Sequence, residues 1–352
     1  MQRIAVIPGD GVGKEVTREA VKVLRALEAS GGPALELVEW PHGADRYLES
    51  GETITDAEFA DLRENYAAIL LGALGDPRVP GNEHARQILL GMRFKLDLFI
   101  NFRPVKLLDA RLTPLKDKTV DDIDFVIFRE NTEGVYVGMG GTFKEGTPDE
   151  VAIQEDVNTR KGVERIVRAA FEYALANGHG RVTLSDKANA MEFAGGIWRR
   201  VFKAVAAEYP EIQTEALYVD MLAMDLVRRP ERYRVIVTGN LFGDILSDLG
   251  AALVGSLGLT ASGNIHPGRV SLFEPVHGSA PDIAGKDQAN PFAAVLTSAL
   301  MLRHLGHADA AARLEEAVRD AVVAGETTAD LGGTLGTRAA GDAIVRRISA
   351  TS

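Results

Sequence analysis

The chain has 352 residues and a formal net charge of −11, with 39 Lys and Arg against 50 Asp and Glu. It has no cysteine, which excludes disulfides, thiolate metal sites and cysteine nucleophiles. The acidic balance argues against nucleic-acid binding, because neutralising phosphates needs a basic surface. No apolar run is long enough to span a membrane, and no signal peptide is recognised. We therefore expect a soluble, cytoplasmic protein of about two domains.

Short apolar segments alternate with helical patterns along most of the chain. The strand-like segments are Ile4–Ile7, Ala67–Leu71, Phe125–Phe128, Val182–Leu184 and Val235–Thr238. Helical spacing of apolar residues marks Val16–Leu27, Gly162–Ala176 and Leu314–Val322. This alternation predicts an α/β fold with mainly parallel strands. Residues 139–158 have no helical period, and their composition alone favours a surface loop over a β-hairpin arm.

The first predicted strand ends in a glycine-rich turn, residues 8–13. Its sequence PGDGVG fails the dinucleotide-binding pattern GxGxxG, because Lys14 occupies the last glycine position. That pattern also requires an acidic residue at the end of the next strand, about 20 residues on, and we recognise none in the expected position. The turn therefore predicts a tight strand-to-helix connection and leaves a ligand role open.

Two acids four residues apart, Asp244 and Asp248, are the most informative pair. On a helix they share one face, and the apolar residues around them argue against a merely solvated charged face. A divalent cation would relieve their repulsion and desolvation, and carboxylate oxygens suit Mg²⁺ or Mn²⁺. The alternative is a pair of acids favoured by the helix dipole. A third ligand comes from either Asp220 or Asp225, which spacing cannot separate.

Three arginines stand beside hydrophobic residues in the first half of the chain: Arg93, Arg103 and Arg129. An unpaired guanidinium is costly there, and its planar fork suits a dicarboxylate. Internal salt bridges explain each arginine equally well. Lys187 is a candidate base and Tyr136 a candidate proton donor. A surface lysine and a packed tyrosine are the simpler interpretations of each residue alone.

A loop rich in Gly and Pro spans Glu274–Gly285. Its backbone groups suit an adenosine, and the Asp282 carboxylate can accept hydrogen bonds from ribose hydroxyls. The same charge would repel a 2′-phosphate, which favours NAD over NADP. His277 by itself is more typical of a structural histidine.

Together, several segments resemble the β-decarboxylating dehydrogenases, the family of isopropylmalate, isocitrate, homoisocitrate and tartrate/D-malate dehydrogenases. The segments are Pro8–Gly13, Asn131–Gly134, Asp186–Asn189, Gly239–Asp248 and Glu274–Gly285, and the resemblance runs from Ile4 to about Gly336. It implies an α/β fold distinct from the Rossmann type, with two domains and the active site between them. The NAD-binding domain is expected in residues 1–98 and 254–352, and the dimerisation domain in residues 99–253.

The resemblance also implies a homodimer whose β arm is residues 139–158. In such dimers Lys187 and Asp220 reach the neighbour's site, while Asp244 and Asp248 serve their own. Tyr136 and Lys187 are the implied catalytic residues. The implied ligands of Mg²⁺ or Mn²⁺ are Asp220, Asp244 and Asp248, which selects Asp220 over Asp225. The implied substrate contacts are Arg93, Arg103, Arg129, Leu89, Leu90 and Asp220. The implied NAD contacts are Glu274, His277, Gly278, Ser279, Ala280, Pro281, Asp282, Ile283 and Asn290.

Enzymes of this family act on malates substituted at C3, and the segment before Arg93 meets that substituent. Leu89 and Leu90 offer an apolar wall, which favours 3-isopropylmalate and the leucine pathway. Arg86 and Ala190 depart from the residues usual in isopropylmalate enzymes. The alternatives are D-malate or tartrate, then homoisocitrate or isocitrate. A regulatory subunit without turnover is the alternative of another class, but it should lack a metal Asp, the Lys or the Tyr, and all are present.

Overall fold

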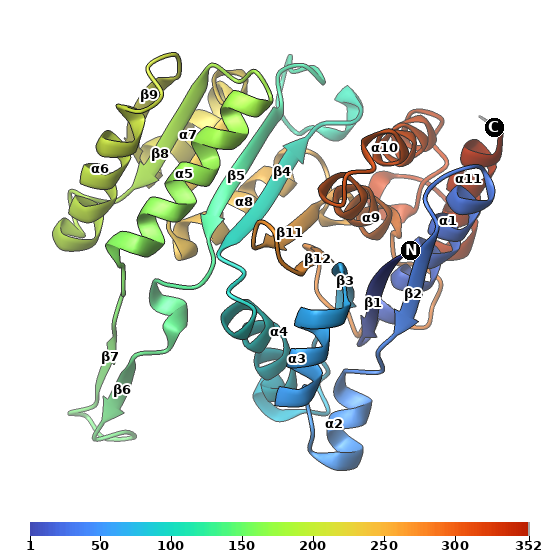
Figure 1. Cartoon of the computed structure of the whole chain (residues 1–352), viewed down its shortest axis with the longest axis horizontal. Helices are drawn as coiled ribbons and strands as arrows, with labels where there is room; N and C mark the ends of the chain where they lie inside the picture. The colour runs from blue at the N-terminus through green and yellow to red at the C-terminus, as the bar shows by residue number, and fades with distance from the viewer. Residues whose placement is uncertain (351–352) are drawn as a thin grey trace. The chain divides into compact units, whose positions relative to one another are not determined.

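The computed structural model describes residues 1–350 and divides the chain into two compact units (Figure 1). Unit 1 comprises Met1–Leu98, Lys106–Val120 and the described residues from Ala251 onward. Unit 2 comprises Phe99–Val105 and Asp121–Gly250. Residues 106–120 and 251–253, which the expected boundaries assign to the second domain, cluster with unit 1.

Unit 1 is built on strands in the order β2-β1-β3-β12-β11. These strands are β1 (Gln2–Gly9), β2 (Leu35–Glu39), β3 (Ala68–Ala73), β11 (Ala261–Ile265) and β12 (Ser271–Pro275). The pairs β1–β2, β1–β3 and β3–β12 are parallel, and β11–β12 is antiparallel.

Helices cover both faces of the unit 1 strands. They are α1 (Gly13–Ala29), α2 (Ala44–Ser50), α3 (Asp56–Asn65), α4 (Glu83–Lys95), α9 (Phe292–His304), α10 (Ala308–Val323) and α11 (Thr337–Ala350). Short 3-10 turns are η1 (Pro80–Asn82), η2 (Ala110–Leu112), η5 (Leu257–Leu259) and η6 (Ala329–Leu331). Along β1, Ile4 and Val6 enter the core under α1, α9, α10 and α11, while Ala5 and Ile7 enter the core under α3 and α4. A strand buried on both faces is apolar throughout, as the sequence pattern predicted.

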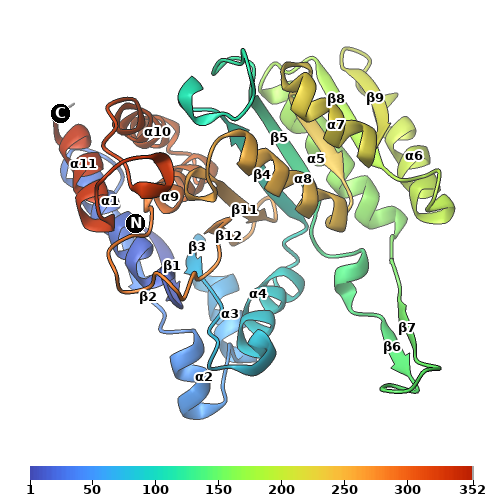
Figure 2. The same cartoon turned by 180° about the vertical axis from the view of Figure 1, so that it is seen from behind.

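Unit 2 has strands in the order β4-β5-β10-β8-β9. These are β4 (Ile100–Lys106), β5 (Asp124–Glu130), β8 (Arg181–Asp186), β9 (Gln213–Tyr218) and β10 (Val235–Thr238), and the pairs from β5 to β9 are parallel. The helices are α5 (Arg160–Ala176), α6 (Glu192–Ala206), α7 (Val219–Arg228) and α8 (Asn240–Leu253), with η3 (Val135–Val137) and η4 (Pro230–Arg232). Helix α5 covers the side of the strands nearer the viewer in Figure 1, and α7 and α8 cover the side nearer the viewer in Figure 2.

A separate hairpin extends from unit 2. It pairs β6 (Gly140–Phe143) with β7 (Val151–Gln154) antiparallel, and every residue of both strands is exposed. Both figures draw it projecting away from the other strands of the unit. Composition alone favoured a loop at this position; the strand pairing expected from the resemblance is present.

The strands and helices predicted from periodicity are confirmed, with ends shifted by a few residues. Helix α5 ends at Ala176, and Gly178 follows with φ +68°, a conformation that favours glycine. Among the described residues, no helix is both long and apolar enough to cross a membrane.

Candidate active site

Asp244 and Asp248 lie on successive turns of α8. Leu246 and Ser247, between them, point into the protein, whereas Asp244 is half-buried and Asp248 exposed. Partial loss of hydration and the Asp244 charge raise the pKa of Asp248, against the lowering effect of the Arg103 and Arg129 guanidinium groups. The predicted carboxylate pair is therefore present on one helix face, and its members repel one another.

Asp244 is the centre of a cluster that joins two predicted site residues. Tyr136, on η3, donates its hydroxyl hydrogen bond to Asp244 Oδ2 at 2.6 Å. Arg129, which is only 1% exposed near the end of β5, forms an ion pair with the other carboxylate oxygen. Its guanidinium also lies 5.2 Å from the centroid of the Tyr136 ring. A proton donor, a cation and a carboxylate thus meet within unit 2.

Asn240 holds this cluster together, and sequence reasoning missed it. Its side-chain oxygen accepts from Arg129 Nε at 3.0 Å, and its side-chain nitrogen donates to the Glu133 carbonyl at 2.9 Å. The first residue of α8 therefore ties Arg129 to the segment that leads into η3 and Tyr136. Its place inside the segment Gly239–Asp248, which carries the resemblance, was the sequence signal available.

The other two predicted arginines are also buried, each 6% exposed. Arg103, on β4, donates from Nε to Asn101 Oδ1 at 2.6 Å. Arg93, on α4 in unit 1, donates to Asn264 Oδ1 at 3.1 Å and to Glu274 Oε1 at 3.4 Å. Burial with side-chain partners fixes the direction of each guanidinium fork.

Lys187 and Asp220 form a second group in unit 2. Lys187 follows β8, Asp220 stands in the first turn of α7, and Nζ donates to Asp220 Oδ1 at 2.5 Å. This bond is the main cause that lowers the pKa of Asp220. The competing acid, Asp225, is buried and bonded to Tyr233 at 2.6 Å and to Arg229, so it serves the packing of α7.

The structure therefore brings the predicted metal ligands together only in part. Asp244 and Asp248 share α8, whereas Asp220 is engaged by Lys187. Across residues 1–350, no group of three or more His, Asp or Glu side chains is gathered closely enough to hold a metal ion.

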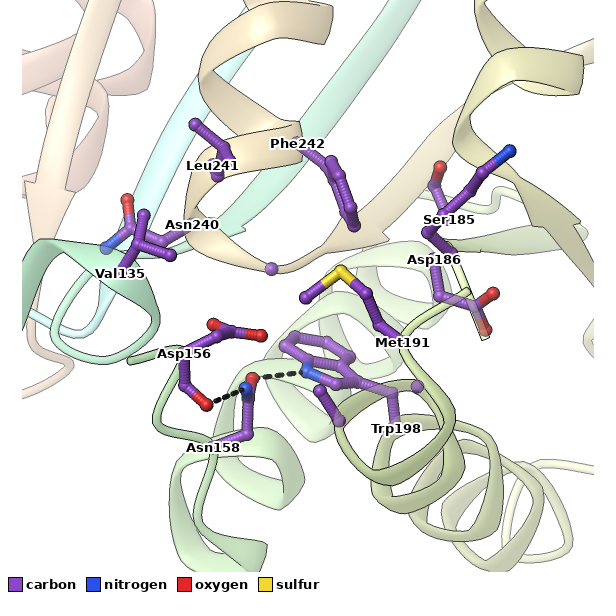
Figure 3. Close-up of a pocket in the computed structure, with 14 residues that line it drawn as sticks. Val135, Asp156, Asn158, Ser185, Asp186, Met191, Trp198, Asn240, Leu241 and Phe242 are labelled. Atoms are coloured by element: carbon purple, nitrogen blue, oxygen red, sulfur yellow. Dashed lines mark hydrogen bonds between the residues drawn. The ribbon is translucent and has the colours of Figure 1, made fainter. Parts of the chain in front are cut away.

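A cavity borders the Lys187 loop within unit 2 (Figure 3). It is lined by the ends of β8 and β10, by α6 and by the start of α8, including Met191, Trp198 and Phe242. Trp198 Nε1 donates to Asn158 Oδ1 at 2.8 Å across its floor. The buried Ser185 hydroxyl has no hydrogen-bond partner. Lys187 itself also lines this largely apolar space.

The predicted cofactor loop lies in unit 1 and is held against the glycine-rich turn after β1. Val12 N donates to Ser279 O at 2.8 Å, and a Cβ at Gly11 would lie 2.1 Å from the same oxygen. Glycine is therefore required where the two segments approach. Ile283 packs beside Val12 and Val16, while Asp282 is exposed.

His277 leaves one ring nitrogen in that loop without a partner. Its Nδ1 lies 3.0 Å from the Gly278 carbonyl, and its Nε2 is buried with no hydrogen-bond partner. Burial lowers the pKa of His277, so the ring is neutral near pH 7. Because a carbonyl only accepts, Nδ1 carries the proton and Nε2 is an acceptor.

Asp10 gives the glycine-rich turn a structural role. The buried carboxylate accepts from Ala44 N at 2.7 Å and Gly75 N at 2.9 Å, and contacts His84 Nε2 at 2.8 Å. The turn is thus a structural junction of three segments in unit 1. Leu89 and Leu90, the predicted substrate wall, are half-buried on α4.

These features define a class: an α/β protein with a carboxylate pair on one helix, a tyrosine and an arginine on one of those carboxylates, and a lysine paired with a third acid. The sequence profile of the isocitrate/isopropylmalate dehydrogenase family matches residues 3–344, and the chain belongs to this family.

Sequence relatives agree with that assignment. The 3-isopropylmalate dehydrogenase of Thermobifida fusca is 48% identical, with 99% of this chain and 98% of the relative covered. That of Streptomyces griseus is 50% identical, with 96% and 98% covered. Among solved structures, isocitrate dehydrogenase from Methylococcus capsulatus is 39% identical with a TM-score of 0.89, and 99% of this chain and all of that chain are covered.

Proposed function

We propose that this protein catalyses the NAD-dependent, divalent-metal-dependent oxidative decarboxylation of 3-isopropylmalate to 4-methyl-2-oxopentanoate and CO₂, a step of leucine biosynthesis. The observation that carries the reaction type is the Asp244 carboxylate, which binds both the Tyr136 hydroxyl and the Arg129 guanidinium and shares a helix face with Asp248. The printed names of the 48–50% identical relatives support the substrate.

The residues present fit a hard divalent cation. Asp244 and Asp248 offer carboxylate oxygens on one helix face. The loss of hydration and the repulsion that raise the pKa of Asp248 are both offset by a bound positive charge. Asp220 would be the third ligand. A metal held there would polarise the 2-hydroxyl of the substrate and its neighbouring carboxylate.

The loop of unit 1 fits NAD. The buried acceptor Nε2 of His277 lacks a partner, and a nucleotide can supply an N–H or O–H donor to it. The exposed Asp282 suits ribose hydroxyls and disfavours a 2′-phosphate. Glu274, Asn290 and the backbone from Gly278 to Ile283 would complete the contacts.

The proton transfers fall to two groups of this chain. Lys187, hydrogen-bonded to Asp220 at 2.5 Å, would take the proton of the substrate hydroxyl. NAD, when bound, would supply the hydride acceptor. Tyr136 would donate a proton to C3 after CO₂ leaves. Arg93, Arg103 and Arg129 would bind the carboxylates of the malate core, and Leu89 with Leu90 would meet the isopropyl group.

A homodimer would explain why unit 2 holds two separate groups of predicted site residues, one around Asp244 and one formed by Lys187 and Asp220. Apolar side chains between 41% and 56% exposed follow one another on α7 and α8: Met221, Met224, Val227, Leu241 and Ile245. The hairpin adds exposed Phe143 and Ile153. Apolar surface of this kind marks an interaction site, and two-fold pairing buries it on both chains. Lys187 and Asp220 would then complete the neighbour's site.

Homoisocitrate is the alternative that one feature of the chain favours. Arg86 is exposed on α4, one turn before the predicted substrate wall, where a cation suits an extra carboxylate. A D-malate or tartrate enzyme would leave Leu89 and Leu90 without a substituent to bury.

The reaction is tested by measuring NADH and CO₂ from 3-isopropylmalate with Mn²⁺. We expect equal amounts of both products, no turnover after chelation of the metal, and no turnover by Lys187→Met. NADH formed without CO₂, or activity that survives chelation, would contradict the proposal.

A further inference from the structure

An ion pair between a buried carboxylate and a partly exposed guanidinium lies at the base of the loop that carries Lys187. Asp186 ends β8 and is 3% exposed. Arg199, on α6, donates from Nε to Asp186 Oδ2 at 2.7 Å and from Nη2 to Oδ1 at 3.0 Å. Asp186 Oδ1 also accepts from the Ala188 backbone N–H at 3.0 Å. One carboxylate thus holds the chain on both sides of Lys187, and a bidentate guanidinium fixes that carboxylate.

The same guanidinium reaches the strand that leads to Asp220. Arg199 lies 4.8 Å from the centroid of the Tyr218 ring, a cation–π distance. Tyr218 ends β9, where it pairs in register with Asp186. Two residues later comes Asp220, whose carboxylate accepts from Lys187 Nζ. Arg199 therefore contacts the last residue of each of the two strands that present the Lys187–Asp220 pair.

We propose that Arg199 is a positioning residue, which acts through Asp186 and Tyr218 to align Lys187 and Asp220 for proton transfer. This inference rests on the proposed function, because it requires Lys187 to be the base. Arginine suits the role, since a planar guanidinium can form two parallel hydrogen bonds while stacking on a ring, and an ammonium cannot. Arg199 needs no contact with the substrate or the cofactor.

The conservative variant Arg199→Lys keeps the charge and removes the fork. In the full-length enzyme with saturating metal, we expect kcat for NADH formation to fall by about ten- to a hundredfold, because small misplacements of a reacting group are costly. KM for NAD should change by less than about twofold, since the residues proposed to bind it lie in unit 1. Millimolar guanidinium ion should restore part of the kcat of Arg199→Ala, because it can refill the same site.

The matched control is Arg168→Lys. Arg168, on α5 in the same unit, binds Glu208 with a comparable fork at 2.8 and 3.0 Å. Its kcat should stay within about twofold of the wild type, because this fork holds no strand end beside Lys187. An equal loss of kcat in both variants would show a general packing effect and overturn the inference.

Two further variants keep the result interpretable. Wild-type kcat in Arg199→Lys, together with an inactive Lys187→Met, would overturn the positioning role and leave the proposed function intact. Activity in Lys187→Met would contradict the proposed function instead. Should Arg199→Lys fail to fold, Tyr218→Leu keeps the ion pair and removes the ring; a lowered kcat with unchanged KM for NAD would support the inference, and an unchanged kcat would overturn it.

Discussion

The surroundings of Asp248 favour the binding of a cation. Partial loss of hydration and the Asp244 charge raise its pKa, so ionisation of this side chain costs free energy in the metal-free protein. A bound cation offsets that cost. Because a ligand carboxylate must be deprotonated, protons compete with the metal at a higher pH than they would for an ordinary aspartate.

We predict that Mn²⁺ affinity, measured by calorimetric titration, rises with pH until Asp248 is fully ionised. Asp248→Asn should weaken binding and flatten this dependence. Asp282→Asn, an exposed acid on the cofactor loop, is the control and should bind Mn²⁺ as the wild type does. Wild-type affinity in Asp248→Asn at every pH would show that the metal binds elsewhere.

Single-residue reasoning from the sequence had a clear limit. The spacing of Asp244 and Asp248 was enough to place them on one helix face, because that relation is local. Spacing could not choose between Asp220 and Asp225; the resemblance selected Asp220. The contacts of Asp225 with Tyr233 and Arg229 are tertiary and add the physical reason. The two bonds of Asn240 are likewise tertiary and have no local signature.

Helix α8 positions the site by letting Arg129 pass close to its backbone. A Cβ at Gly243 would lie 2.5 Å from Arg129 Cγ and 2.6 Å from its Cβ, distances that no real contact tolerates. The glycine therefore sets where β5 and α8 meet. The Arg129–Asp244 ion pair depends on that approach.

We predict that Gly243→Ala displaces Arg129 and lowers kcat/KM for the acid substrate by at least about tenfold. Gly180→Ala is the control, because a Cβ there meets nothing within 4 Å. Steady-state kinetics of both variants decides the question. Equal kcat/KM values in the two variants would contradict the role given to Gly243.

The cofactor loop is expected to determine the preference for NAD over NADP. Asp282→Lys combined with Ile283→Tyr should shift the ratio of kcat/KM from NAD toward NADP, because the exchange replaces a repulsive charge with one that attracts a 2′-phosphate. Asp309→Lys, on the exposed start of α10, makes the same charge change away from the loop. If the ratio stays at its wild-type value in the double variant, this loop does not determine the preference for NAD over NADP.

Among the elements, the hairpin was the hardest to predict from residues alone. The buried strands β1, β3 and β10 carry near-continuous apolar residues, which is a strong signal. Strands β6 and β7 bury neither face within the described chain. Their sequences therefore show no alternation of apolar and polar residues that would predict a strand. The pairing of β6 with β7 therefore followed only from the resemblance.

For the whole molecule, the proposed homodimer divides each site between two chains. A site would take Asp244, Asp248 and Tyr136 from one protomer and Lys187 with Asp220 from its partner. Such a division makes inactive variants complementary.

We predict that Lys187→Met and Asp244→Asn, each inactive alone, recover activity when unfolded together and reassembled. Half of the random dimers are mixed and each contains one intact site, so roughly a quarter of wild-type activity should return. Two Lys187→Met preparations mixed with each other are the control. No recovery, despite mixed dimers seen by mass spectrometry, would place all the groups on one chain.

The most direct test of the central claim is the comparison of kcat/KM for 3-isopropylmalate, D-malate, D-tartrate, isocitrate and homoisocitrate with NAD and Mn²⁺. We predict that 3-isopropylmalate is preferred over D-malate by roughly thirtyfold, because burying the isopropyl group against Leu89 and Leu90 contributes roughly 2 kcal/mol. A preference for D-malate, or for either tricarboxylate, would contradict the proposed substrate.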